Sequence, residues 1–274
     1  MKHSKPLAAL TIALVLATSA YAATPLQAAS SSALPSVGDI PAPLVLAVQT
    51  GLKIVQRFPA ADGMTGWVLS RGPGQNMVVY STPKADVVIA GNMLDAKGHN
   101  LSQEYLDKYA PKVDYSKYWS KVQASTYFKE GARGKAVTNT LYAIEDPNCP
   151  FCNLAWKSLQ PYEKKGLQVR WIPVAFEAKD SMNKAAAILE AKDPAKANAA
   201  WHAKFEQPDP ALSNYQPSAA VEAKIKANLK LMSDMGLGGT PSFLWKDKTG
   251  KVSAISGMPS PEQLSALVKD AVKD

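Results

Sequence analysis

Apolar and polar positions divide the chain into stretches with different periods. Residues 36–98 open with a short helical pattern at 41–49 and continue with four short apolar runs, which turns rich in Gly and Pro separate. The runs occupy residues 51–58, 66–70, 77–81 and 86–91. Short runs bounded by turn residues predict an antiparallel meander. We therefore expect a small α+β domain over residues 36–98.

The stretch at 99–129 follows the helical period instead. Asn100 with Gln103 forms an N-terminal capping pattern, and Pro111 is expected to end the first helix. A second helix is expected from Asp114, with a stripe at positions i, i+3, i+4 and i+7. The stripe consists of Tyr115, Tyr118, Trp119 and Val122. Such a stripe is more typical of core packing than of a binding face, and we interpret 99–129 as a helical linker.

Strand and helix patterns alternate over residues 130–274. The expected elements are a strand at 137–144, a helix at 148–165, a strand at 167–176, helical pieces within 180–235, a hairpin of 242–246 with 252–256, and a helix at 261–272. A βαβ unit, a helical insertion and a ββα ending are typical of a thioredoxin-like domain. The expected fold class is therefore an α+β domain followed by an α/β domain.

The first 22 residues have the pattern of a signal peptide. Lys2 and Lys5 precede the apolar run 7–17, and Ala20-Tyr21-Ala22 has the small-x-small form of a cleavage site. The run is shorter than the roughly 20 residues of a membrane-spanning helix, so a retained anchor is the weaker alternative. We expect export after removal of 1–22, with 23–35 as a flexible, Ser- and Ala-rich lead-in.

The charge of the chain argues against one class of partner. The net charge is +8, and removal of the two leader lysines lowers it to +6. The basic residues are spread along the chain, and no basic run is interleaved with aromatic residues. Nucleic acid is therefore not an expected partner.

The sequence holds two cysteines, Cys149 and Cys152. A chain of this length can bury a core without disulfides, and a bond across two residues closes almost no loop, so a purely structural disulfide is disfavoured. A zinc site would need two further ligands, and His99 and His202 are far away in sequence. We therefore expect a chemical role for the pair, with no metal and no cofactor.

The motif Cys149-Pro150-Phe151-Cys152 follows an expected strand and opens an expected helix. Free backbone N–H groups and the dipole at a helix start favour an anion, so the pKa of Cys149 should fall below that of a free thiol. Pro150 suits the first helical position, which needs no amide donor. We predict that Cys149 is the exposed, low-pKa nucleophile and that Cys152, turned into the helix, is buried and resolves the mixed disulfide.

Several segments carry a family resemblance. They are Leu34-Pro-Ser with Pro41-Ala-Pro43, Asp146-Pro147 with the cysteine motif, Ala185–Leu189 with Lys192-Asp-Pro-Ala-Lys196, and Gly239-Thr-Pro241. Together they run from about Leu34 to the C-terminus and resemble the DsbC/DsbG family of periplasmic thiol:disulfide isomerases in the thioredoxin superfamily. The Cys-Pro-aromatic-Cys motif favours the DsbG branch, although Phe151 stands where that branch usually has Tyr. The lost hydroxyl should alter partner contacts more than mechanism.

The resemblance implies a homodimer. Residues 36–98 would form a cystatin-like dimerisation domain, 99–129 the linker, and 130–274 the catalytic domain. Pro241 would be the cis-proline of the thioredoxin fold, so that Thr240 and Pro241 present backbone to the substrate chain. Thioredoxins carry a buried carboxylate six residues before the first cysteine, where this chain has Ala143. The proton acceptor for Cys152 is therefore left open between water and Glu145.

The resemblance also implies the activity. It implies a periplasmic enzyme that acts in its reduced form on wrong disulfides or cysteine sulfenic acids of exported proteins, with some chaperone activity and with DsbD as the membrane reductant. Two alternatives are a dithiol oxidase similar to DsbA, which lacks an N-terminal domain of this kind, and a chaperone in which the cysteines are incidental. A Cys149→Ala variant separates these, because a chaperone would keep its activity.

Overall fold

The computed structural model describes residues 40–205 and 207–274 of the chain. The predicted signal peptide (1–22) and lead-in (23–35) lie outside the described residues. Within the described part, no helix combines the length and the apolar character needed to cross a membrane. The described residues form an N-terminal sheet and a C-terminal sheet, each with its own core.

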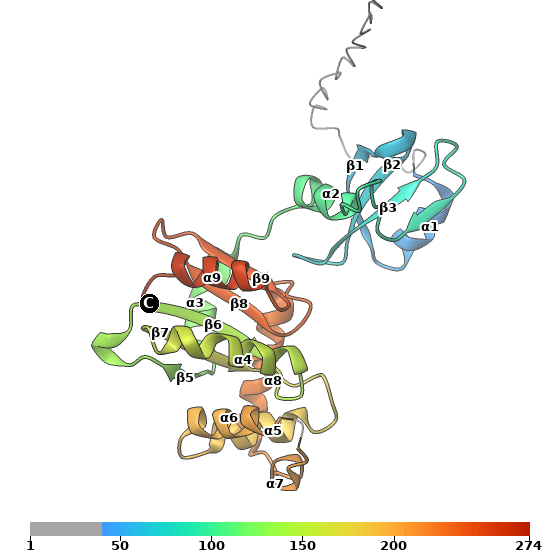
Figure 1. Ribbon diagram of the computed structural model, residues 1–274. Helices are drawn as coiled ribbons and strands as arrows, with labels where there is room; N and C mark the ends of the chain where they lie inside the picture. Colours follow the sequence, from blue (N-terminus) through green and yellow to red (C-terminus); the bar gives the residue numbers. More distant parts are fainter. Residues whose placement is uncertain (1–39, 206) are drawn as a thin grey trace, which may run out of the picture. The chain divides into compact units, whose positions relative to one another are not determined.

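The N-terminal sheet is the antiparallel meander that the turn pattern predicts (Figure 1). Its strand order is β1-β2-β3-β4, and one helix precedes it. The elements are α1 (Ala42–Gln49), β1 (Lys53–Pro59), a 3-10 turn η2 (Ala61–Gly63), β2 (Thr65–Ser70), β3 (Asn76–Ser81) and β4 (Val88–Ala90). The predicted helix and all four predicted strands are therefore confirmed, with shifts of one or two residues at their ends.

Both faces of the N-terminal sheet are covered. On one face Trp67 of β2 packs with Leu44 of α1, and on the other Phe58 of β1 stacks on Tyr109 with ring centroids 4.3 Å apart. A Cβ at Gly66 would lie 2.2 Å from the Phe58 ring, so only glycine leaves room for that ring. Tyr109 belongs to α2 (Leu101–Tyr109), which therefore packs on this sheet.

The predicted capping of α2 is confirmed. Asn100 accepts a hydrogen bond from the backbone N–H of Gln103 at 3.1 Å, and the helix ends at Tyr109, before Pro111. The next predicted helix starts as a 3-10 turn, η3 (Tyr115–Tyr118), and continues as α3 (Trp119–Gln123). Trp119 and Val122 are buried in the C-terminal core, as the stripe predicts. The stretch expected to be a linker thus contributes one helix to each core.

The C-terminal sheet has the strand order β5-β7-β6-β8-β9, in which β6 and β7 are parallel and the other pairs antiparallel. The strands are β5 (Phe128–Gly131), β6 (Asn139–Glu145), β7 (Leu167–Pro173), β8 (Ser242–Lys246) and β9 (Val252–Ser256), with a 3-10 turn η4 (Gly134–Ala136) before β6. The sequence pattern anticipates all of these strands except β5. The expected domain start at residue 130 falls inside β5, which pairs with β7.

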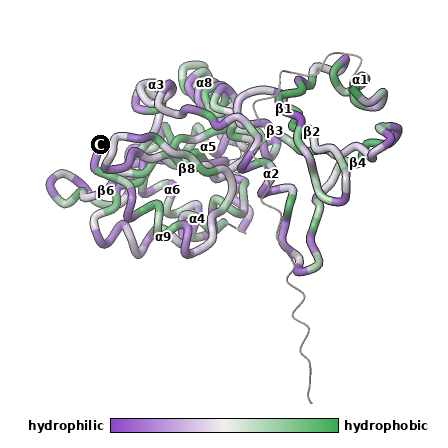
Figure 2. The backbone as a smooth tube through the Cα atoms, turned by 90° about the horizontal axis from the view of Figure 1, so that it is seen from above, coloured by the Kyte–Doolittle hydropathy of each residue, from purple (hydrophilic) through white to green (hydrophobic). Residues whose placement is uncertain are grey.

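Helices cover both faces of this sheet (Figure 1). Besides α3, the helices of this part of the chain are α4 (Pro150–Glu163), α5 (Ser181–Glu190), α6 (Pro194–Ala203), α7 (Pro210–Ser213), α8 (Ala219–Asp234) and α9 (Pro261–Asp270). One core contains buried residues of α4, α6 and α9, and the opposite core contains those of α3 and α8. Hydrophobic and hydrophilic residues alternate along the surrounding helices, as expected for helices with one buried face (Figure 2). The central strand β6 is buried and ends at the cysteine motif.

Candidate active site

The turn between β6 and α4 places Cys149 at a helix start, as predicted. Cys149 is the N-cap residue of α4, with extended backbone angles, and Pro150 follows at the first helical position. The backbone N–H of Cys149 bonds to the carbonyl oxygen of Asp146 at 3.0 Å, and that of Cys152 bonds to the carbonyl oxygen of Cys149 at 3.0 Å. The first turn of α4 thus holds both sulfurs on one side of the motif.

A buried carboxylate fixes this turn. Asp146 is fully buried and accepts four hydrogen bonds. The donors are the backbone N–H of Asn148 (2.9 Å), the hydroxyl of Ser181 (2.8 Å), and the backbone N–H groups of Phe176 (2.7 Å) and Glu177 (3.0 Å). Asp146 therefore ties the motif to the loop after β7 and to the start of α5.

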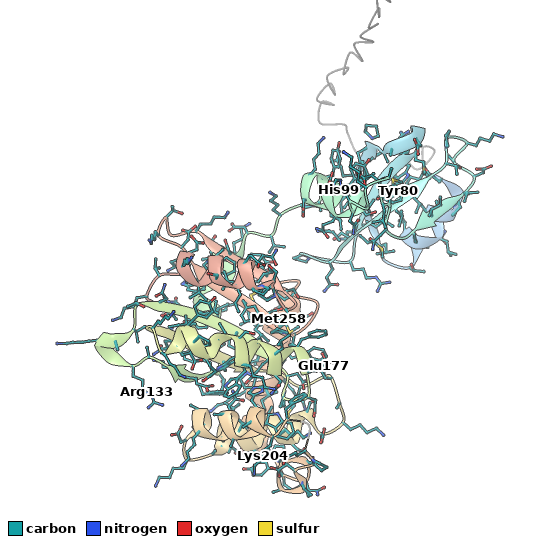
Figure 3. All side chains as sticks on the ribbon, viewed as in Figure 1. Tyr80, His99, Arg133, Glu177, Lys204 and Met258 are labelled. Carbon is teal, nitrogen blue, oxygen red and sulfur yellow. The ribbon has the colours of Figure 1, made fainter. Side chains whose placement is uncertain are left out.

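The start of β8 brings a second segment to Cys149. The Thr240-Pro241 peptide bond is cis, and Sγ of Cys149 lies 3.3 Å from the carbonyl oxygen of Thr240. Both the cis bond and its closeness to the motif are thereby confirmed. The hydroxyl of Thr240 donates to Oε1 of Glu177 (labelled in Figure 3) at 3.4 Å.

Both cysteines are free thiols, and both are buried. Cys149 is only 3 % exposed, so the expectation of an exposed nucleophile is wrong. Cys149 is buried because its sulfur faces the Thr240 carbonyl. Thr240 is 91 residues away in sequence, so the sequence pattern around the motif does not predict this contact. Cys152 is fully buried, as predicted.

The two thiols differ in acidity in the predicted direction. A hydrogen bond from the Cys152 thiol is the main cause that lowers the pKa of Cys149, and the backbone N–H groups of Cys152 and Phe151 add to it. Burial acts in the opposite sense, and the net pKa of Cys149 is about 6. Burial, the hydrogen bond to Cys149 and the charge of Glu145 raise the pKa of Cys152 far above that of a free thiol. At neutral pH the pair therefore holds one thiolate and one thiol.

One residue near the motif escapes sequence reasoning. His202, on α6, is buried, and its Nε2 lies 3.2 Å from Oε2 of Glu145, the last residue of β6. From the sequence, His202 is considered only as a remote zinc ligand, because no local pattern places α6 beside the end of β6. In residues 40–205 and 207–274, no group of three or more His, Cys, Asp or Glu side chains is arranged to bind a metal ion.

Apolar side chains are exposed near the cysteines. Phe151 within the motif is 58 % exposed, and Leu154, one turn into α4, is 47 % exposed. Phe176, whose backbone N–H binds Asp146, is 44 % exposed. These side chains form exposed apolar surface close to the motif in sequence or through Asp146.

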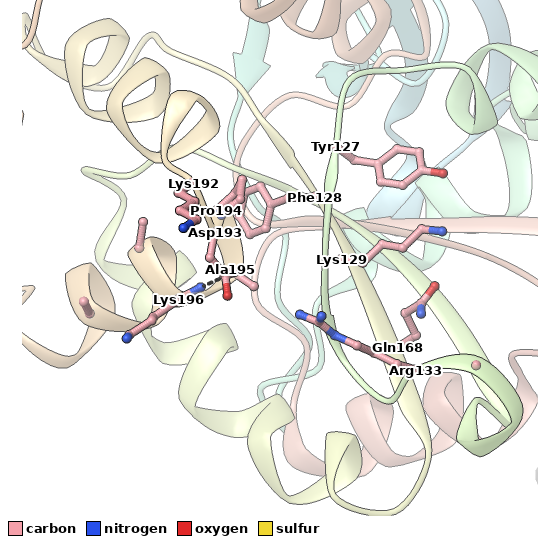
Figure 4. A pocket seen from close by; sticks show the side chains of 13 residues that line it. Tyr127, Phe128, Lys129, Arg133, Gln168, Lys192, Asp193, Pro194, Ala195 and Lys196 are labelled. Atoms are coloured by element: carbon pink, nitrogen blue, oxygen red, sulfur yellow. Dashed lines mark hydrogen bonds between the residues drawn. The ribbon is translucent and has the colours of Figure 1, made fainter.

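A separate cavity of about 1170 Å³ lies beside β5 and the start of α6 (Figure 4). Its lining includes four basic side chains, those of Lys129, Arg133, Lys192 and Lys196. Neither cysteine lines it, and neither Thr240 nor Pro241 does. The cavity is therefore distinct from the cysteine motif at the start of α4.

Known proteins resemble this chain in sequence. The family model described as a thioredoxin-like domain matches residues 129–272. The thiol:disulfide interchange protein DsbG of Pseudomonas aeruginosa is 34 % identical over 237 residues, which cover 84 % of this chain and 89 % of that protein. DsbG of Escherichia coli is 30 % identical over 236 residues, covering 84 % of this chain and 92 % of that protein.

Solved structures also include similar chains. The catalytic domain of Proteus mirabilis ScsC is 21 % identical, with a TM-score of 0.46, and the match covers 57 % of this chain and 95 % of that one. Helicobacter pylori DsbG is 16 % identical, with a TM-score of 0.38, and the match covers 73 % of this chain and 97 % of that one.

Proposed function

The chain belongs to the DsbG family of thiol:disulfide interchange proteins, and from this premise we propose that Cys149 is its nucleophile and Cys152 its resolving thiol. The protein is a thiol–disulfide oxidoreductase with a thioredoxin-like catalytic domain. The observation that carries the proposal is the split acidity of two adjacent free thiols at a helix start, next to a cis-proline turn.

The reaction follows from the difference in pKa between the two thiols. The Cys149 thiolate attacks one sulfur of a substrate disulfide, a Cys149–substrate bond forms, and the other substrate sulfur leaves as a thiolate. In isomerisation a substrate thiolate then displaces Cys149, which is regenerated. In reduction Cys152 displaces the substrate sulfur, so that the substrate gains two electrons and the enzyme pair becomes a disulfide. With a sulfenic acid, attack by Cys149 releases water after protonation, and Cys152 completes the reduction.

Substrate contacts are proposed for the turn that faces Cys149. Thr240 and Pro241 would present backbone to an extended substrate chain, and the exposed ring of Phe151 would contact its side chains. The substrates would be exported proteins with wrong disulfides or oxidised single cysteines. The signal-peptide pattern of residues 1–22 supports a periplasmic location, where such proteins fold.

The remaining partners follow from the family. DsbD would return the pair to its reduced form, and two chains would dimerise through residues 36–98. Chaperone activity would accompany the exchange reaction. The similarity to DsbG proteins over 84 % of this chain, together with the N-terminal sheet, disfavours both the DsbA-like oxidase and the chaperone with incidental cysteines.

Refolding of ribonuclease with scrambled disulfides tests the function. The reduced wild-type protein should accelerate recovery of ribonuclease activity, because Cys149 opens wrong disulfides. Cys149→Ala should abolish that acceleration, whereas Ser158→Ala, a partly exposed position on the same helix, should preserve it. A Cys149→Ala protein as active as the wild type would refute the proposed nucleophile. Suppression of aggregation of a cysteine-free client measures chaperone activity separately.

A further inference from the structure

A ring of contacts surrounds Cys152 inside the catalytic domain. The backbone N–H of Asp146 donates to the sulfur of Cys152, and Glu145 precedes Asp146 at the end of β6. On the other side, Asn153 directly follows Cys152 and binds His202, whose Nε2 in turn faces Glu145. Cys152, Asn153, His202 and Glu145 are all at most 6 % exposed. The hydrogen bonds thus connect the buried Glu145 carboxylate to the segment that carries Cys152, and the charge of Glu145 acts on the Cys152 thiol.

The hydrogen bonds of Asn153 determine which nitrogen of His202 carries the hydrogen. Nδ2 of Asn153 lies 2.7 Å from the backbone oxygen of His202, and only the NH₂ end of an amide can face a carbonyl. The same Nδ2 lies 3.2 Å from Nδ1 of the His202 ring, so Nδ1 accepts. A neutral imidazole with an accepting Nδ1 has its hydrogen on Nε2. His202 therefore donates to Oε2 of Glu145, which acts as the acceptor.

Two further contacts hold the imidazole ring in place. Trp156 stacks on it with centroids 5.2 Å apart, and Trp171 lies against it at 6.3 Å. Nε1 of Trp156 donates to Glu130, whose other oxygen lies 3.4 Å from Nδ2 of Asn198. The ring is therefore fixed by packing as well as by hydrogen bonds.

From this geometry we propose that Glu145 accepts the proton of Cys152 when the mixed disulfide is resolved, and that His202 is the residue that positions the Glu145 carboxylate. The inference rests on the proposed function and names the base that the exchange reaction requires. Cys152 is buried and is a thiol at neutral pH, whereas only a thiolate attacks a disulfide. Because Cys152 has no contact with solvent, water cannot readily take its proton, and a base inside the domain is needed as the acceptor.

The proton and the electrons balance in one step. The S–H bond of Cys152 breaks, and its proton passes to the Glu145 carboxylate, directly or through one water molecule. The Cys152 sulfur then forms a bond to Sγ of Cys149, while the bond from Cys149 to the substrate sulfur breaks and the substrate leaves as a thiolate. When the pair is later reduced, Glu145 returns the proton to Cys152.

Other ionisable groups surround this pair. Glu130 on β5 interacts electrostatically with both Glu145 and His202, and Glu163 at the end of α4 interacts with Glu130. Burial raises the pKa of Glu130, and burial followed by the Glu130 charge raises the pKa of Glu163 to about 8. Glu163→Gln therefore serves as a control for replacing a buried acidic side chain of α4 at the end of the helix away from Cys152.

The reaction of the reduced full-length protein with 5,5′-dithiobis(2-nitrobenzoate) separates the two steps by stopped flow. Attack by Cys149 releases a first coloured thiolate, and attack by Cys152 on the mixed disulfide releases a second. Glu145→Gln should slow the second release roughly tenfold or more at pH 7 and leave the first unchanged, within the range of general-base catalysis. The second rate of the variant should then rise steeply with pH, because solvent must take the proton.

The direction in which Glu145→Gln changes the second rate shows whether Glu145 accepts the proton or is only a charge near Cys152. Removal of a charge that only raises the pKa of Cys152 would accelerate the second release, and that result, or an unchanged rate, would overturn the proposal. Loss of the first release in the wild-type protein would instead refute the proposed function. Glu163→Gln should change neither phase.

Variants of His202 test whether this residue positions the Glu145 carboxylate. They do so without changing Glu145, so the test remains possible if Glu145→Gln does not fold. His202→Gln keeps an N–H donor near the place of Nε2 and should retain most of the second rate. His202→Leu removes that donor, and it should slow the second release and give it the steep pH dependence expected of Glu145→Gln. Equal second rates and pH profiles for the Leu variant and the wild type would contradict the role of His202.

Discussion

Several donors near the sulfur of Cys149 favour its charged form, although the carbonyl oxygen of Thr240 also lies 3.3 Å from it. The thiol of Cys152 and the backbone N–H groups of Cys152 and Phe151 lower its pKa to about 6, from an ordinary value of 9.0, despite burial. At pH 7 Cys149 is then mainly thiolate, the reactive form. Because the folded pKa is lowered, the resulting stabilisation of the reduced protein is complete only above the ordinary thiol pKa and is lost as the pH falls through about 6.

The rate of alkylation by iodoacetamide measures this acidity. The rate at Cys149 should be half-maximal near pH 6 and level off above pH 7, and Cys152 should not react in the folded protein. In Cys152→Ala the midpoint should move to higher pH, since the main donor is gone. A wild-type midpoint near 9 would contradict the account, as would faster labelling of Cys152.

At this scale the sequence predicts the motif but not its surroundings. The helix start and Pro150 at its first position follow from four consecutive residues, so the direction of both pKa shifts is predictable. The burial of Cys149 depends on Thr240, and the contact of Glu145 depends on His202. These partners are 91 and 57 residues away in sequence, and no local pattern reports such distances.

Among the elements, the junction of β6 with α4 depends on Asp146. This carboxylate accepts hydrogen bonds from Asn148, Phe176, Glu177 and Ser181, and it is fully buried. Asp146→Ala leaves four donors without an acceptor, each in a site that water reaches poorly. We expect the free energy of unfolding to fall by at least about 3 kcal/mol, as measured by urea denaturation.

Asp193→Ala is the matched control for that measurement. Asp193 is an exposed N-cap of α6 that accepts one hydrogen bond from the backbone N–H of Lys196 at 3.2 Å. Loss of this capping hydrogen bond should lower the free energy of unfolding by about 1 kcal/mol. Equal costs for the two aspartates would show that Asp146 does not hold the junction together.

The elements that sequence reasoning anticipates are those with strong local signals. The final hairpin and the helix at the motif appear where apolar runs, turns and caps predict them. Strand β5 is missed because Phe128-Lys-Glu-Gly131 is short and mostly polar, and Glu130 is buried only through Trp156 and Asn198. Helix α3 begins as a 3-10 turn after Asp114, a distinction that apolar spacing does not make.

For the molecule as a whole, the N-terminal domain retains exposed apolar side chains. Leu46 is 65 % exposed and Val48 40 % exposed on α1, while Val87, Ile89 and Leu94 are 45–60 % exposed near β4. Their exposure supports the proposal that residues 36–98 pair with a second copy of the chain.

Light scattering on two forms of the protein tests this proposal. The chain from residue 23 onward should be a dimer, whereas a fragment that begins at residue 112 should be a monomer that still reduces small disulfides. The fragment begins at 112 because Trp119, Val122 and Phe128 belong to the C-terminal cores. A fragment from residue 130 should therefore be less stable. A dimeric 112–274 fragment would overturn the assignment.

Trapping of the mixed disulfide tests whether Cys149 attacks disulfides and Cys152 resolves the product. Reduced Cys152→Ala protein is mixed with a disulfide-bonded peptide, and the products are identified by mass spectrometry under non-reducing conditions. We expect a stable mixed disulfide between Cys149 and one peptide cysteine, no such adduct with Cys149→Ala, and only transient adducts with the wild type. A peptide attached to Cys152 in the Cys149→Ala protein at the same rate, or no adduct on Cys149 in the Cys152→Ala protein, would contradict these roles of the two cysteines.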